Sequence, residues 1–125
     1  MKTTLSATIL ALSLSMAGSV EARPEIETVA GMLEACVEAT QDPPTEMGYY
    51  CYGTVKGASQ ILRWDCTNRS IGYNARRGIG KVPDVTDGMA AFVIWAEAHP
   101  EFANETAVDG IQAALMEFFP CEYEQ

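Results

Sequence analysis

The stretch GYYCYGTVKGASQIL, residues 48–62, decides the fold. Its apolar and small residues recur at spacings of three and four, which is the period of an amphipathic helix. That stripe consists of Cys51, Thr54, Val55, Ala58 and Leu62. The spacing predicts a helix that starts at Thr45 or Glu46, runs to about Arg63 and forms the centre of a small bundle.

Two glycines, Gly53 and Gly57, lie one turn apart within this predicted helix. A glycine inside a helix costs roughly 1 kcal/mol relative to alanine, so the pair needs a structural reason. The usual reason is that another backbone passes where a Cβ would collide. We therefore expect a helix crossing at these two positions. A membrane dimer motif is disfavoured because Lys56, Gln60 and Arg63 interrupt the apolar run.

The first 22 residues have the composition of a secretory signal peptide. Lys2 provides a short positive region, residues 5–16 are mostly apolar, and Val20 and Ala22 occupy the positions that signal peptidase reads. A membrane anchor needs about 20 apolar residues, and Thr, Ser and Gly interrupt this run too often. We expect residues 1–22 to be removed, leaving a single exported, periplasmic domain of residues 23–125.

All four cysteines, Cys36, Cys51, Cys66 and Cys121, follow the expected cleavage site. An even number of cysteines in a small exported chain predicts two disulfides rather than a metal site, since only one histidine is present. Cys36 lies late in one predicted helix and Cys51 early in the next. In an antiparallel hairpin the two come opposite each other, which favours a bond between them. Cys121 then pairs most simply with Cys66.

Three further segments have helical periodicity: residues 26–39, a segment from Asp84 or Thr86 to about residue 98, and one from Asn104 or Thr106 to Pro120. Between them, residues 64–83 (WDCTNRSIGYNARRGIGKVP) have no usable period. No stretch alternates long enough to indicate a sheet. The expected fold class is all-α, a small four-helix bundle with two disulfides and one long irregular loop between its second and third helices.

The irregular loop, together with Arg63 just before it, holds five of the eight bases of an otherwise acidic chain, whose net charge is −9. One interpretation is a solvated loop whose bases balance neighbouring acids. The other is a partner-binding loop in which Tyr73, Arg76 and Arg77 are the anchors and Arg69 and Lys81 assist, because Tyr and Arg are favoured at protein–protein hot spots. The acidic surface argues against binding to nucleic acid or to an anionic membrane.

Motifs for catalysis, metal binding or cofactor binding are not found in the sequence. There is no nucleophile elbow and no phosphate-binding loop. His99 has no free thiol to activate if the cysteines are paired. We therefore expect a protein that is not an enzyme, has no cofactor and acts by binding. Phe92, Ile94 and Trp95 widen the apolar surface of the third helix, which indicates either deep burial or a pairing face.

Several motifs occur in a fixed order along the mature chain. LEAC at residues 33–36 is followed by YCYGTVKG at residues 50–57, P-x-V-T at residues 83–86, AHPE at residues 98–101 and AALMEFFPC at residues 113–121. The combination resembles the Rap/Tai-type immunity proteins, periplasmic inhibitors of the peptidoglycan amidases that type VI secretion delivers. The third cysteine departs from the pattern, because members often carry one nearer to Lys81.

The resemblance implies an all-helical, disulfide-bonded, often dimeric protein that binds a cell-wall hydrolase and plugs its cleft with a protruding segment. It names no particular effector. An alternative function is that of a periplasmic stress chaperone, similar in size and build to the Hde-type acid-stress proteins. The apolar surface around Phe92, Ile94 and Trp95 would then bind client proteins.

Overall fold

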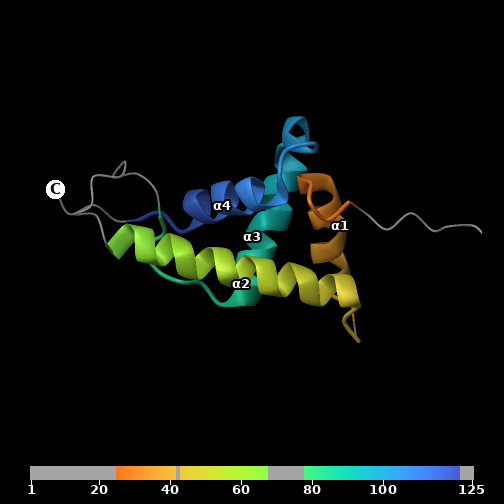
Figure 1. The fold of residues 1–125 in the computed structure, drawn as a ribbon, viewed down its shortest axis with the longest axis horizontal. Helices are drawn as coiled ribbons and strands as arrows, with labels where there is room; N and C mark the ends of the chain where they lie inside the picture. Colours follow the sequence, from red (N-terminus) through yellow and green to blue (C-terminus); the bar gives the residue numbers. More distant parts are fainter. Residues whose placement is uncertain (1–24, 42, 68–77, 122–125) are drawn as a thin grey trace, which may run out of the picture.

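The computed structural model describes residues 25–41, 43–67 and 78–121, and within them the chain is helical. Figure 1 shows the arrangement. The elements in order are α1 (Val29–Glu38), α2 (Glu46–Thr67), α3 (Val85–Ala98), the short 3-10 helix η2 (Pro100–Phe102) and α4 (Ala107–Phe118). In these three ranges the only extended pairings are two isolated β-bridges. The predicted all-α four-helix fold with two disulfides is confirmed.

Helix α2 is the longest element and contacts each of the other three α-helices. Figure 1 shows it running along the domain, with α3 crossing it, α4 beside it and α1 near its N-terminal end. Its inward residues Val55 and Leu62 are fully buried together with Phe92, Ile111 and Leu115. Burying one such side chain is worth about 1.5–3 kcal/mol, so this cluster provides the main apolar stabilisation.

Helices α1 and α4 begin side by side and satisfy each other's first backbone donors. The N–H of Val29 donates to the carbonyl of Glu105 at 2.9 Å, and the N–H of Ala107 donates to that of Glu27 at 2.7 Å. Such donors have no partner within their own helix. Thr28 also caps α1, so this helix starts at Val29 rather than at the predicted residue 26.

Helix α4 begins with a shortened capping box at Thr106, one of the two starts expected from the sequence. The Thr106 hydroxyl accepts a hydrogen bond from the N–H of Asp109 at 3.4 Å and donates one to the Asp109 carboxylate at 2.6 Å. Asp84 likewise caps α3, where its carboxylate accepts from the N–H of Thr86. These caps fix the starts of both helices at the residues that the sequence indicates.

Both predicted disulfides are present. Cys36 is bonded to Cys51, with Cα atoms 5.1 Å apart, and Cys66 to Cys121, with Cα atoms 5.8 Å apart. None of the four cysteines is free. Two structural disulfides in a small domain are typical of a non-reducing compartment outside the cytosol. Within the described residues, no helix has the length and apolar character needed to cross a membrane.

The predicted helix crossing at Gly53 and Gly57 is wrong. A Cβ built on either glycine meets no atom within 4 Å, and both residues are exposed. The close approaches occur elsewhere: a Cβ on Gly48 would lie 2.7 Å from the Cα of Ala39, and one on Gly110 would lie 2.6 Å from Val29 Cγ2. The mistake has a geometric cause, because the buried stripe and the glycine pair lie on opposite sides of α2.

One further expectation about residue positions needs correction, and one pair of alternatives can be decided. The irregular loop does not start at Trp64, since α2 continues for one more turn to Thr67 and so brings Cys66 to its disulfide partner. For the wide apolar surface of α3, burial and a pairing face were the two alternatives, and two of its three large side chains are buried. Phe92 and Trp95 are 0% and 6% exposed, and only Ile94 remains at the surface, with 55% of its side chain exposed.

Candidate protein-binding surfaces

Four of the five predicted partner-binding side chains lie outside the described residues. These are Arg69, Tyr73, Arg76 and Arg77. Lys81, the fifth, lies in the described segment before α3 and is exposed. The structure therefore describes where this loop leaves and rejoins the domain, and the geometry of those two points can be examined.

The two ends of the loop meet at the C-terminal end of α2. Gly78 has a φ of 120°, which favours glycine, and a Cβ on it would lie 2.7 Å from both the N of Cys66 and the O of Leu62. The N–H of the next residue, Ile79, donates to the same Leu62 carbonyl at 3.1 Å, and Ile79 is fully buried. The chain therefore returns to within contact distance of the helix that it left.

The C-terminal segment, residues 119–121, also contacts this junction. Gly80 N–H donates to the carbonyl of Phe119 at 3.1 Å, and Ile79 forms a β-bridge with Pro120. The Cys66–Cys121 disulfide joins the same two segments covalently. Backbone hydrogen bonds and a disulfide thus fix the two points at which the described chain connects to residues 68–77.

Two bases line a hollow at this junction. Arg63 Nη1 donates to the carbonyl of Gly80, and Lys81 follows directly in sequence. The hollow measures about 350 Å³ and is also lined by Cys66, Phe119 and Pro120. We call these residues, with Gly80, the loop base. Its exposed Lys81 can pair with a carboxylate or a carbonyl of a partner, although a single exposed pair of this kind contributes only about 0–1 kcal/mol.

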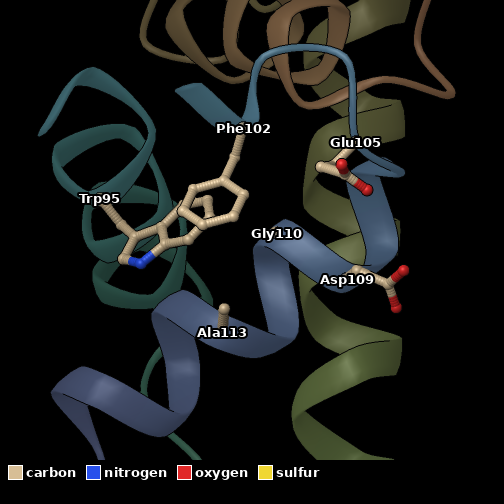
Figure 2. Close-up of a pocket in the computed structure, with 6 residues that line it drawn as sticks. All are labelled: Trp95, Phe102, Glu105, Asp109, Gly110 and Ala113. Atoms are coloured by element: carbon tan, nitrogen blue, oxygen red, sulfur yellow. The ribbon is translucent and has the colours of Figure 1, made fainter. Parts of the chain in front are cut away.

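A second hollow, of about 240 Å³, lies between α3, η2 and the start of α4. Figure 2 shows the stacked rings of Trp95 and Phe102 on one side of Gly110, and the carboxylates of Glu105 and Asp109 on the other. The ring centroids are 5.6 Å apart. No charge is directed at the rings in this view, so the hollow offers an apolar wall rather than a reactive centre.

The single histidine is part of this aromatic cluster. The ring of His99 stacks on that of Trp95 at 4.8 Å, and its Nδ1 lies 2.8 Å from the Trp95 carbonyl oxygen, which requires the proton on Nδ1. All four cysteines are in disulfides, so none can act with His99 as a nucleophile. No cluster of three or more metal-ligating side chains occurs among the described residues. Among the described residues, His99 therefore contacts aromatic rings and a backbone carbonyl rather than a thiol.

The outward side of α2 is a third surface, which the sequence analysis did not identify. Half of the ten large hydrophobic side chains that are exposed in the described part of the chain lie on this helix. We call six residues the α2 outer face: Tyr49, Tyr50, Gly53, Gly57, Ile61 and Trp64. The signal was present in the sequence, because residues three and four positions apart on the side opposite the buried stripe share one face.

Comparisons of the chain with models of known protein families, with characterised proteins and with solved structures find no match.

Proposed function

We propose that the protein is an exported immunity protein: a non-enzymatic, periplasmic domain that binds and inhibits a peptidoglycan amidase delivered by type VI secretion. Residues 1–22 act as its signal peptide. The observation that carries the proposal is the order of the LEAC, YCYGTVKG and FPC motifs in an all-α domain. The two disulfides join these motifs, because Cys36–Cys51 links the first two and Cys66–Cys121 ties the third to α2.

The contact with the amidase is assigned to the loop carried by the loop base. Support comes from its composition, with Tyr73, Arg76 and Arg77 within it and the exposed Lys81 where it rejoins the domain. A segment that leaves and returns at one fixed point can enter a cleft without disturbing the bundle. Anchoring at its base also reduces the entropy lost when it binds.

The first test is capture of partners by the oxidised protein, produced with its own export signal, from secreted and periplasmic proteins of its own and competing strains. We expect recovery of a small cysteine–histidine amidase, whose hydrolysis of peptidoglycan the protein then blocks at an equimolar ratio. Recovery of no cell-wall hydrolase would contradict the proposal. Recovery of many unrelated proteins, with more at low pH, would indicate a chaperone.

The loop assignment is tested by changing Arg76→Ala together with Arg77→Ala. If these side chains are hot spots, binding to the amidase weakens by more than about 2 kcal/mol, while the thermal midpoint stays nearly unchanged. Lys56→Ala is the control, because it removes an exposed base from α2, away from the loop base. Equal affinity of the double variant and the control would show that the amidase is bound elsewhere.

The chaperone alternative depended on an exposed apolar surface around Phe92, Ile94 and Trp95, and most of that surface is buried. Phe92 and Trp95 are buried in the core, and Ile94 alone does not make a client-binding patch. No other described feature favours that function over inhibition of a hydrolase.

A further inference from the structure

The hollow between α3, η2 and the start of α4 combines aromatic and acidic side chains. We call it the aromatic hollow, and its six lining residues are Trp95, Phe102, Glu105, Asp109, Gly110 and Ala113. Figure 2 shows the two rings on one side of the glycine and the two carboxylates on the other. Its volume of about 240 Å³ lies below the roughly 300–1,000 Å³ of sites for drug-sized ligands, so the aromatic hollow fits a single side chain rather than a cofactor.

The elements around the aromatic hollow carry negative charge. Residues 82–121, which include α3, η2 and α4, contain seven aspartates and glutamates but no lysine or arginine. Helix α1, which begins beside α4, has no lysine or arginine either. Glu105 and Asp109 are both exposed, and the hydrogen bond that the Asp109 carboxylate accepts from Thr106 uses one of its roughly four acceptor sites. Charge complementarity therefore favours a cation as the occupant.

The aromatic wall narrows the choice of cation. The rings of Trp95 and Phe102 stack with an interplanar angle of 24°, and Phe102 keeps 40% of its side chain exposed. An aromatic ring face attracts a cation and also packs against aliphatic carbon. The occupant that matches both kinds of lining has an apolar stem and a cationic end, as lysine and arginine do. Arginine matches better, because its planar guanidinium stacks on rings and pairs with carboxylates through parallel hydrogen bonds.

We propose that the aromatic hollow binds an arginine side chain presented by a protein partner. The stem of the arginine packs on the rings of Trp95 and Phe102, and its guanidinium pairs with the carboxylates of Glu105 and Asp109. A single inserted side chain of this kind is typical of the anchors at which protein interfaces concentrate their binding energy. This site goes beyond the proposed inhibition of an amidase and does not depend on it.

The aromatic hollow is separate from the loop base, although α4 connects them. Asp109 lies in the first turn of α4, whereas Phe119 of the loop base directly follows its last residue. Ten residues of helix span about 15 Å, which exceeds the Debye length of about 8 Å at physiological ionic strength. The acidic hollow and the basic loop base thus act as independent charges, and each can be altered without changing the other.

The test uses nuclear magnetic resonance titrations of the oxidised, exported protein with two capped peptides. One peptide carries a single arginine among alanines, and the other carries citrulline, which has the same shape but no charge. We expect the arginine peptide to shift the Trp95 indole N–H and the Phe102 signals with a dissociation constant in the millimolar range. The citrulline peptide should bind at least about threefold more weakly, because it loses the attraction to both the rings and the carboxylates. Added salt should weaken binding of the arginine peptide only.

Two variants assign the binding to the lining of the aromatic hollow. Glu105→Gln should weaken binding of the arginine peptide about two- to fivefold and leave that of the citrulline peptide unchanged. Glu117→Gln is the matched control, since it removes the same charge from an exposed position of α4 that does not line the hollow. Phe102→Leu keeps apolar bulk but removes the ring, and it should also weaken binding of the arginine peptide.

Circular dichroism and the thermal midpoint follow folding in the same samples. Glu105→Gln should leave both unchanged, because the backbone carbonyl that accepts from Val29 N–H is retained. Equal binding of the arginine and citrulline peptides would overturn the proposal, as would equal effects of Glu105→Gln and Glu117→Gln. Absence of any shift at Trp95 and Phe102 would overturn it as well.

Discussion

The two sides of α2 differ in burial, and their residues differ accordingly. On the inner side, Cys51, Val55 and Leu62 are at most 1% exposed, and their spacing and size follow from the need to fill a core. On the outer side, Gly53 and Gly57 face open space between large apolar residues. The inner side is explained by folding alone. The outer side is exposed and contributes little to the core, and substitutions on the two sides measure the difference.

The largest effect is expected at the two ends of the inner side, where the disulfides attach. In the chain-entropy model, closing 55 residues between Cys66 and Cys121 stabilises the fold by roughly 4 kcal/mol, and closing 15 residues between Cys36 and Cys51 by roughly 3 kcal/mol. Denaturant unfolding of the two double-alanine variants measures these values. The ranking would be contradicted if loss of the Cys36–Cys51 bond were the more damaging change.

Neighbouring residues on the two sides allow a direct comparison of burial. Leu62 is 1% exposed and Ile61 is 58% exposed. Leu62→Ala should lower the free energy of unfolding by roughly 3 kcal/mol, through lost apolar burial and the cavity that remains. Ile61→Ala should change it by less than about 0.5 kcal/mol, as is usual for surface positions. Urea titrations at a low protein concentration, where any dimer has dissociated, compare the two. Similar losses of unfolding free energy for both variants would mean that the outer side of α2 is packed as closely as its inner side.

A smaller effect is expected where a glycine does allow a close approach. A Cβ on Gly48 would lie 2.7 Å from the Cα and 3.0 Å from the N of Ala39, which are backbone atoms just beyond α1. Backbone cannot move aside as a flexible side chain can, so Gly48→Ala should cost about 1–3 kcal/mol. A thermal melt against the wild type measures the loss. An unchanged midpoint would show that the hairpin between α1 and α2 adjusts without strain.

The sequence predicted those features that depend on local chemistry. Thr106 and Asp109 mark the start of α4 because a hydroxyl three residues before an acid satisfies free N–H groups in any protein. Cys36 and Cys51 could be paired because a short loop leaves an antiparallel hairpin few alternatives. Periodicity also located α2, whose buried residues include four of the five in the predicted stripe. Local rules of this kind apply without knowledge of how the helices pack against one another.

The errors concern relations between distant parts of the chain. Gly53 and Gly57 were placed at a helix crossing because helical glycines usually allow one, although their rotation away from Val55 and Leu62 puts them outside. For Trp95, burial and a pairing face stayed open as alternatives, because the choice depends on η2 and α4, whose positions follow from tertiary packing. The candidate loop was recognised by its composition, whereas its base depends on hydrogen bonds from Ile79 and Gly80 to Leu62 and Phe119.

The smallest predicted effect is expected on the outer side of α2, and it has the opposite sign to the losses on the inner side. Gly53→Ala adds a methyl group that meets nothing in the monomer and removes the helix penalty of glycine, so it should raise the free energy of unfolding by up to about 1 kcal/mol. A thermal melt and a urea titration of the variant against the wild type measure the gain. A loss of stability would mean that the methyl group meets an atom that the open space at Gly53 does not indicate.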